Sequence, residues 1–200
     1  KKRKELKKII YLGSVEDLNF IKKTNKELEI GATVPLISFE EQIKKYYFDF
    51  YNILKRYGSV QIRNVGTIAG NIATASPIGD SLPLLMALDS KVVVDGNNGK
   101  KVIPINKFFI GYRKTKLKKN EFIYSIKIPL LKGNIFKAYK ISKRFDDDIS
   151  SVCGSFNLVI DKNYIKKVKI AFGGMSEVPK RATKTEEMLE NSKFNEETFD

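Results

Sequence analysis

The chain has 200 residues, of which 42% are hydrophobic and 30% are charged, and its formal net charge at pH 7 is +14. This length and composition suit an ordinary globular protein of one domain or two small ones. No apolar run approaches the roughly 20 residues that a membrane-spanning helix needs, and no apolar signal segment follows the basic start, so we expect a cytoplasmic protein without a membrane partner.

The rarest residue types exclude several kinds of chemistry. The sequence contains no histidine, which excludes histidine-based acid–base catalysis, Ser-His-Asp triads and histidine-ligated zinc. The single cysteine, Cys153, can form no disulfide within the chain and cannot hold an iron–sulfur cluster, which needs about four thiolates. Because Cys153 lies in a run of small and apolar residues, we expect a packed core thiol. Redox chemistry would therefore require a bound organic cofactor.

The first 58 residues predict short elements followed by one helix. Residues 1–8 favour a basic helical turn, and short strands are expected at 9–12, 15–21 and 28–30. Ser38 and Glu41 have the spacing of a capping box, which predicts a helix beginning there. An apolar stripe at helical spacing continues this helix until Gly58, which is expected to end it. The stripe consists of Phe39, Ile43, Tyr47, Phe50, Leu54 and Tyr57.

Residues 58–83 are the densest stretch of small, polar and turn-forming residues. Glycines at 66, 70 and 79 allow positive φ or a close approach of the backbone to another group. Backbone N–H groups freed in such a segment can bind anions. The stretch favours a loop that holds a phosphate-bearing or heteroaromatic ligand, although a plain set of turns has the same composition. It is neither a P-loop nor a G-x-G-x-x-G motif.

Beyond this stretch, the pattern predicts a buried helix at 83–88 and a hairpin whose strands, 91–95 and 101–105, flank Asn-Asn-Gly. A strand is expected at 121–129, because its residues alternate and end at a proline.

A turn-rich stretch at residues 130–134 predicts a boundary between two domains, 1–130 and 131–200. The second domain is expected to be a smaller α+β unit with an antiparallel sheet. Its expected strands are 135–142, 150–160 and 164–172, and a helix follows from about residue 185. The acidic residues near the end are expected to be solvated; they are Glu186, Glu187, Glu190, Glu196 and Glu197.

Three successive carboxylates, Asp146 to Asp148, follow the cations of Lys140 to Arg144. This pattern fits a metal site, a loop of ion pairs or a mobile gate. Hard metal ions prefer more oxygen ligands in a defined turn, so we assign no metal ligand here.

The order of residues from Gln61 to Asp80 resembles the signature of the FAD-binding domain of molybdenum hydroxylases. The matching pattern is Gln-Ile-Arg-Asn-x-Gly-Thr-Ile-Ala-Gly-Asn-Ile-x-x-x-Ser-Pro-x-x-Asp, and residues 74–80 look most like the xanthine dehydrogenases. Phe108 to Thr115 and Gly173 to Met175 also agree with that family, in the same order. The resemblance covers residues 30–189, with Ala69 standing where many members carry a second glycine.

The resemblance implies an α+β fold. It would comprise a two-part FAD-binding domain, the PCMH-type flavin fold, incomplete at its N-terminus, and then a small α+β domain. In the family, a glycine-rich loop that holds the flavin pyrophosphate lies just upstream, so we expect this chain to be an internal fragment of a longer polypeptide. The implied function is to carry electrons from 2Fe-2S clusters through FAD to NAD+. The iron–sulfur clusters and molybdopterin are expected on other domains or subunits of a larger oligomer.

The resemblance also implies which residues hold the cofactor, while no residue of this chain is expected to be catalytic. An aromatic ring at Tyr57 would pack on the flavin, and Ile123 would touch its ring unless it is a simple core residue. Lys140 and the acidic loop would tune the flavin, and Asp80 would accept from a ribose or ribityl hydroxyl. The expected cofactor-binding residues are Tyr57, Gly66, Thr67, Gly70, Asn71, Thr74, Ser76, Asp80, Ile123 and Lys140.

Three alternatives stay open at this point. In the first alternative, the chain belongs to another molybdenum hydroxylase, whose substrate is carbon monoxide, nicotinate, an aldehyde or hydroxybenzoyl-CoA. A second alternative is a basic nucleic-acid-binding module, but the lysines are scattered and no known motif is present, so no nucleic-acid partner is expected. The third is a degenerate domain that serves only in assembly.

Overall fold

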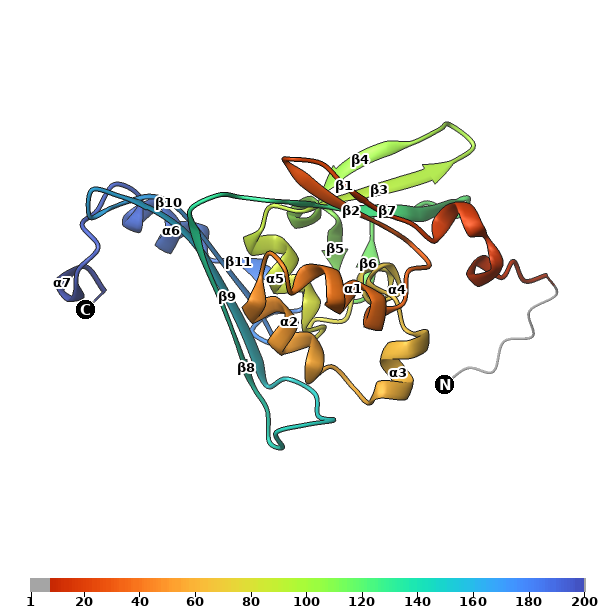
Figure 1. The fold of residues 1–200 in the computed structure, drawn as a ribbon, viewed down its shortest axis with the longest axis horizontal. Coiled ribbons are helices and arrows are strands. Elements are labelled where there is room, and N and C mark those ends of the chain that lie inside the picture. Colours follow the sequence, from red (N-terminus) through yellow and green to blue (C-terminus); the bar gives the residue numbers. More distant parts are fainter. Residues whose placement is uncertain (1–7, 200) are drawn as a thin grey trace.

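The chain folds into two larger antiparallel sheets, with a group of helices in the angle between them, and one two-stranded sheet (Figure 1). This computed structural model describes residues 8–199, so the basic turn predicted at the N-terminus lies almost entirely outside the described residues. Every strand pair within that range is antiparallel, and the helices and strands are interspersed along the chain. The predicted α+β class is confirmed.

The first sheet has five strands in the order β1-β2-β7-β3-β4, with β7 at its centre. The predicted hairpin is β3 and β4, and the predicted strand that ends at a proline is β7. Alternate residues of the central strands, such as Val92, Ile126 and Ile128, are fully buried against the helices. The strands are β1 (Ile21–Lys23), β2 (Glu27–Gly31), β3 (Lys91–Gly96), β4 (Lys101–Pro104) and β7 (Glu121–Pro129).

The strand predicted at residues 9–12 is wrong, and the one predicted at 15–21 is wrong apart from its last residue. The chain instead forms two 3-10 turns, Leu12–Ser14 and Glu16–Leu18, and the first strand begins only at Ile21. The side chains of residues 9–11 are largely exposed, because no sheet edge lies beside them to bury an apolar strand. A short apolar run does not by itself distinguish a strand from a turn.

The single helix predicted between residues 38 and 58 is two helices, α1 (Leu36–Ile43) and α2 (Phe48–Lys55). The break lies at Tyr47, whose φ of −136° is not helical. Its hydroxyl donates to the Pro129 carbonyl over 2.7 Å and accepts from the Leu131 amide over 3.1 Å. The predicted capping box is wrong as well, because α1 begins after Pro35 and Ser38 lies inside the helix. Gly58 does follow α2 in a left-handed conformation, with φ +58°.

Three further helices connect α2 to the first sheet. α3 (Val60–Val65) and α4 (Ile68–Thr74) occupy half of the stretch predicted as a ligand-holding loop. α5 (Ser81–Ala87) is the predicted buried helix, and all seven of its residues are buried. A short hairpin, β5 (Phe109–Gly111) and β6 (Lys114–Thr115), and a 3-10 turn at Ile105–Lys107 lie between β4 and β7.

The second sheet has four strands in the order β11-β10-β9-β8, and α2 and α5 pack against its inner face. Leu85, Cys153 and Ala171 belong to the same core as the buried residues of the first sheet. The opposite face packs against α6 (Thr183–Leu189) through Ile165, Val168 and Ile170. The elements are β8 (Asn134–Ile141), β9 (Val152–Asp161), β10 (Tyr164–Gly173), β11 (Lys180–Arg181), α6 and α7 (Glu196–Phe199).

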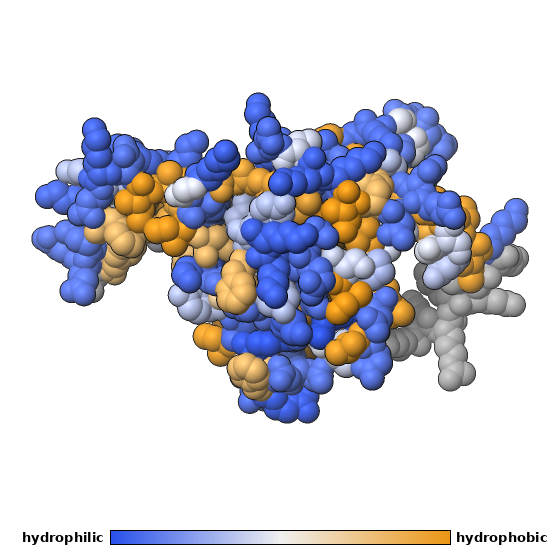
Figure 2. Space-filling view, in the orientation of Figure 1, coloured by the Kyte–Doolittle hydropathy of each residue, from blue (hydrophilic) through white to orange (hydrophobic). Residues whose placement is uncertain are grey.

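One member of the acidic tail departs from the prediction. Glu186 is buried, because its carboxylate accepts from the side chain of Arg181 and from the Ile170 amide. Glu187, Glu190, Glu196 and Glu197 are exposed, as expected. On the face drawn in Figure 2, hydrophilic residues cover most of the surface and hydrophobic residues form separate patches. No helix among residues 8–199 is both long enough and apolar enough to cross a bilayer.

Candidate functional site

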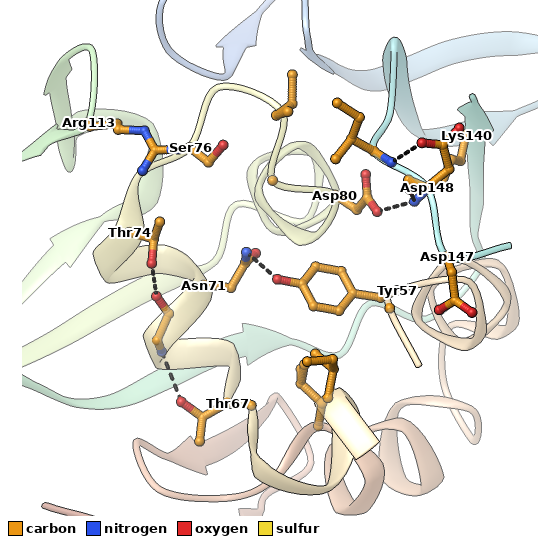
Figure 3. Close-up of a pocket in the computed structure, with 18 residues that line it drawn as sticks. Tyr57, Thr67, Asn71, Thr74, Ser76, Asp80, Arg113, Lys140, Asp147 and Asp148 are labelled. Carbon is orange, nitrogen blue, oxygen red and sulfur yellow. Dashed lines mark hydrogen bonds and ion pairs between the residues drawn. The ribbon is translucent and has the colours of Figure 1, made fainter. Parts of the chain in front are cut away.

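A hollow of about 620 Å³ opens between the turn after α2, helix α4, the loop before α5 and the loop after β8 (Figure 3). Nine of the ten predicted cofactor-binding residues line this hollow, although they come from distant parts of the chain. Their contact with a cofactor stays a prediction. The nine are Tyr57, Gly66, Thr67, Gly70, Asn71, Thr74, Ser76, Asp80 and Lys140.

Helix α4 forms one wall of the hollow, and its small residues have structural roles. The Thr67 hydroxyl caps the helix by accepting from the Gly70 amide over 2.9 Å, and the Thr74 hydroxyl donates to the Gly70 carbonyl over 2.9 Å. A Cβ at Gly70 would lie 3.1 Å from the Thr67 hydroxyl oxygen, so glycine avoids a tight contact at this position. The glycines at 66, 70 and 79 do not adopt positive φ, whereas Ala75 does, with φ +47°. Close approach is therefore the property that these glycines supply.

Tyr57 is held at its hydroxyl by a chain of hydrogen bonds. The Asn71 amide nitrogen donates to the Tyr57 oxygen over 2.7 Å, and the Ser81 hydroxyl donates to the Asn71 oxygen over 2.5 Å. Burial, with a smaller contribution from the charge of Asp80, raises the pKa of Tyr57. The tyrosine therefore stays neutral, and its own proton is free to be donated to a ligand.

A buried ion pair closes the opposite wall. Lys140 Nζ lies 2.6 Å from Asp80 Oδ2, and the Ser150 hydroxyl donates to the other Asp80 oxygen. Lys140 also donates to the carbonyl of Asp148 over 2.8 Å. Both oxygens of Asp80 already have partners within the chain, so the hollow presents a paired carboxylate, whose contact with a cofactor hydroxyl stays a prediction. This pairing offsets the cost of burying both charges.

Arg56 connects α2 to the acidic loop after β8. Its guanidinium donates to the Phe145 and Lys140 carbonyls over 2.9 and 3.2 Å, and it lies over the Phe145 ring at 4.4 Å. The Asp148 carboxylate accepts from the amides of Arg144 and Ile149, and the first of these bonds lowers its pKa. The loop is thus held by ion pairs and hydrogen bonds. Among residues 8–199, no cluster of three or more His, Cys, Asp or Glu side chains could hold a metal ion.

Ile123 lies apart from the other nine predicted residues. It is buried on β7 and lines a second hollow of about 650 Å³, together with Leu117 and Phe122. Thr67 and Gly70 line both hollows, which therefore lie on the two sides of the start of α4.

Sequence reasoning assigned no role to several residues at the site. Arg113 has φ +51° in the β5–β6 turn, and its side chain points toward Ser76 (Figure 3). Arg113 lies within residues 108–115, a segment that agrees with the resembled family, so the sequence contained an indication of its importance. Ser81 and Ser150 carry no comparable signal, because their roles depend on residues 10 and 70 positions away.

The side chains around the hollow can bind and orient a ligand. Burial, and then the charge of Asp80, raises the pKa of Cys153 to about 12, so its thiol does not act as a nucleophile near neutral pH. The hollow combines apolar side chains with an aromatic ring, hydroxyls, an amide and two cations, as pockets for large organic cofactors do. Fold and site together define an α+β domain that binds such a cofactor.

The family follows from comparison with known proteins. Residues 1–131 match the FAD binding domain in molybdopterin dehydrogenase, and residues 137–200 match the CO dehydrogenase flavoprotein C-terminal domain. The chain belongs to the family of FAD-binding domains of molybdopterin dehydrogenases, and its cofactor is FAD. The resemblance found in the sequence is confirmed.

Individual relatives differ in their substrates. A xanthine dehydrogenase of Blastobotrys adeninivorans is 36% identical over 205 residues, which cover 94% of this chain and 15% of that protein. A nicotinate hydroxylase of Emericella nidulans is 39% identical over 197 residues, covering 95% of this chain and 14% of that protein. The chain therefore spans about one seventh of the length of these relatives.

A solved structure supports the fold. The carbon monoxide dehydrogenase of Hydrogenophaga pseudoflava superposes with a TM-score of 0.86 at 24% identity, over 92% of this chain and 65% of that one.

The residues present fit FAD. Hollows on both sides of Thr67 and Gly70 suit an elongated molecule, and glycine at position 70 adds no side chain to the wall between them. The ring of Tyr57 offers an aromatic face, whereas Ser76 and Arg113 supply donors of the kind that phosphate and hydroxyl groups accept.

Proposed function

We propose that this chain is the FAD-carrying electron-transfer segment of a xanthine dehydrogenase-like molybdenum hydroxylase. The observation that carries the proposal is the hollow itself, because residues of the family signature converge there with Lys140 from the second sheet. The identity of 36% to a xanthine dehydrogenase supports the choice of enzyme. Bound FAD would supply the redox chemistry, accepting electrons from 2Fe-2S clusters and delivering hydride to NAD+.

The chain's own residues would bind and orient this cofactor. Tyr57 would contact its ring system, while Asn71 fixes the tyrosine hydroxyl at 2.7 Å. Thr67, Gly70, Thr74 and Ser76 would line its path along α4. The ammonium group of Lys140, paired with Asp80, would lie near the flavin, where a positive charge favours the reduced form of the flavin.

We further propose that the chain divides near residue 130 into an FAD-binding domain, 1–130, and a second domain, 131–200. The two sheets and the two family matches support this division. The iron–sulfur clusters and molybdopterin would reside on other domains or subunits of a larger cytoplasmic oligomer. Hydroxylation of a purine would take place there.

The experiment is a visible absorption spectrum of the purified full-length gene product, recorded before and after anaerobic addition of NADH. A flavin band that is bleached by NADH is expected. A full-length protein without flavin would refute the proposal, and a flavin that NADH leaves oxidised would refute its electron acceptor.

A second candidate substrate is nicotinate, because the nicotinate hydroxylase is 39% identical to the chain. The two substrates are separated by using xanthine and nicotinate in turn as the only reductant of the same flavin. We expect xanthine to bleach the band and nicotinate to leave it unchanged.

A further inference from the structure

Arg63 is a buried arginine next to the candidate site, and none of the roles above uses it. It belongs to the Gln-Ile-Arg-Asn segment of the signature and lies on α3 with its side chain only 5% exposed. Its Nη1 atom donates to the Gly58 carbonyl over 2.6 Å and to the Lys55 carbonyl over 3.2 Å. These two carbonyls stand on either side of Tyr57 in the chain.

Glu40 on α1 supplies the opposite charge. Its Oε2 atom lies 3.4 Å from Arg63 Nε, and the side chain is 2% exposed. The contact is an ion pair without the geometry of a hydrogen bond. A guanidinium buried at this depth without a carboxylate would be costly, so Glu40 is what allows Arg63 to lie there. α1 thereby holds Arg63, and Arg63 holds the turn between α2 and α3.

This turn needs an external support. Gly58 has φ +58°, and a Cβ at that position would lie 3.2 Å from Ile62 Cγ2. Residues 56–59 belong to no helix, and the Tyr57 amide bonds only to the last turn of α2 through the Leu54 carbonyl. Arg63 fixes the backbone on both sides of Tyr57, whereas Asn71 fixes the far end of its ring.

We propose that Arg63, held by Glu40, is a positioning residue that orients the ring of Tyr57 for contact with FAD. The proposal rests on the proposed function, because it takes FAD as the occupant of the hollow. Arg63 does not touch the cofactor and acts only through Tyr57.

The test is a double-mutant cycle in the full-length gene product, stripped of flavin and titrated with FAD by fluorescence. Arg63→Met is expected to raise the Kd for FAD about tenfold, and Tyr57→Leu is expected to raise it at least as much. Because Arg63 acts through Tyr57, adding Arg63→Met to Tyr57→Leu should cause no further loss. Additive losses in the double variant would overturn the proposal.

A matched control separates positioning from general stability. Arg181 forms a comparably buried pair with Glu186, with side chains 9% and 6% exposed, and lines neither hollow. Arg63→Met and Arg181→Met are both expected to lower the thermal midpoint, but only Arg63→Met should weaken FAD binding. Equal weakening by both variants would overturn the proposal.

If Arg63→Met does not fold, Arg63→Lys takes its place in the cycle. Lysine keeps a charge near Glu40 but lacks the planar fork that reaches two carbonyls at once. A folded Arg63→Lys variant that binds FAD like the wild type would overturn the proposal. A wild-type full-length protein without flavin would instead refute the proposed function, so the two failures are distinguishable.

Discussion

Lys140 Nζ lies 2.6 Å from Asp80 Oδ2, and the two side chains are only 1% and 6% exposed. The pair joins β8 of the second sheet to the start of α5, across 60 positions of sequence. Ser150 completes it from the loop that precedes β9. The wall of the hollow therefore depends on both sheets being present and correctly packed.

Replacing Lys140 is expected to be strongly destabilising. Lys140→Met leaves Asp80 buried without its cation, which should cost about 3–5 kcal/mol in the free energy of unfolding, measured with urea. Lys137→Met is the control on the same strand. Its pair with Asp49 is half exposed, so less than about 1 kcal/mol should be lost. Equal losses in the two variants would contradict a structural role for the buried pair.

The same substitution should lower the flavin midpoint potential in the full-length protein. A positive charge near the flavin stabilises the reduced, more negative form, so its removal favours the oxidised form. The measurement is an anaerobic redox titration of Lys140→Met, with Lys137→Met alongside it. An unaltered potential in Lys140→Met would leave Lys140 with a structural role alone.

Asn71 and Thr67 can be tested together. Thr67→Leu combined with Asn71→Leu should strip FAD from the full-length protein, because Tyr57 loses the donor that fixes its hydroxyl and α4 gains bulk beside Gly70. The lost cap of α4 should cost only about 1 kcal/mol, so the protein should stay folded. Thr67→Ser keeps the capping hydroxyl and should retain FAD. Unchanged flavin content in the double variant, measured after desalting, would refute the assignment.

The sequence predicted the presence of the helices and the hairpin better than it predicted where each helix begins and ends. The stripe from Phe39 to Leu54 is buried as predicted, but the helix breaks at Tyr47 because the tyrosine hydroxyl bonds to the linker near Pro129. That partner lies 82 positions away, beyond the reach of local periodicity. The stretch predicted as a ligand-holding loop is partly helical for a local reason, since the hydroxyls of Ser59 and Thr67 cap α3 and α4.

The sequence indicated residues that line one hollow, but it did not indicate the hydrogen bonds and ion pairs among them. Nine of the ten residues line one hollow because the signature supplies one wall and a distant lysine supplies the other. Ile123 lies in the second hollow, and no pattern on a single strand tells which of two hollows it faces. The pairing of Asp80 with Lys140 and Ser150 joins residues 60 and 70 positions apart, so no local pattern predicts it.

Cys153 predicts a pH dependence of stability. Burial, followed by the charge of Asp80, raises the pKa of the thiol from 9.0 to about 12. Above pH 9 the unfolded chain releases the thiol proton while the native state keeps it. The stability gained from the neutral thiol is therefore complete below that pH and is lost as the pH rises toward 12.

Urea unfolding at about pH 8 and about pH 10.5 checks this dependence. The wild type should lose more stability between the two values than Cys153→Ala, which lacks the thiol. Tyr47 and Tyr57, whose pKa values are also raised, contribute equally to both proteins and cancel in the comparison. Identical losses would contradict the assignment of the effect to Cys153.

Glu186 should be the one residue of the acidic tail whose loss matters. Its Oε1 atom accepts from the Ile170 amide over 2.7 Å, and its Oε2 atom accepts from Arg181 over 2.5 Å. Glu186→Ala removes these bonds, together with the one from Arg181 Nε to Oε1, and leaves Arg181 with only the exposed carboxylate of Asp89, so about 3–5 kcal/mol should be lost in urea unfolding. Glu187→Ala, one position on and exposed, should change stability by less than about 0.5 kcal/mol. The two variants differ only in what the carboxylate touches, so equal effects would contradict a role for the buried bonds.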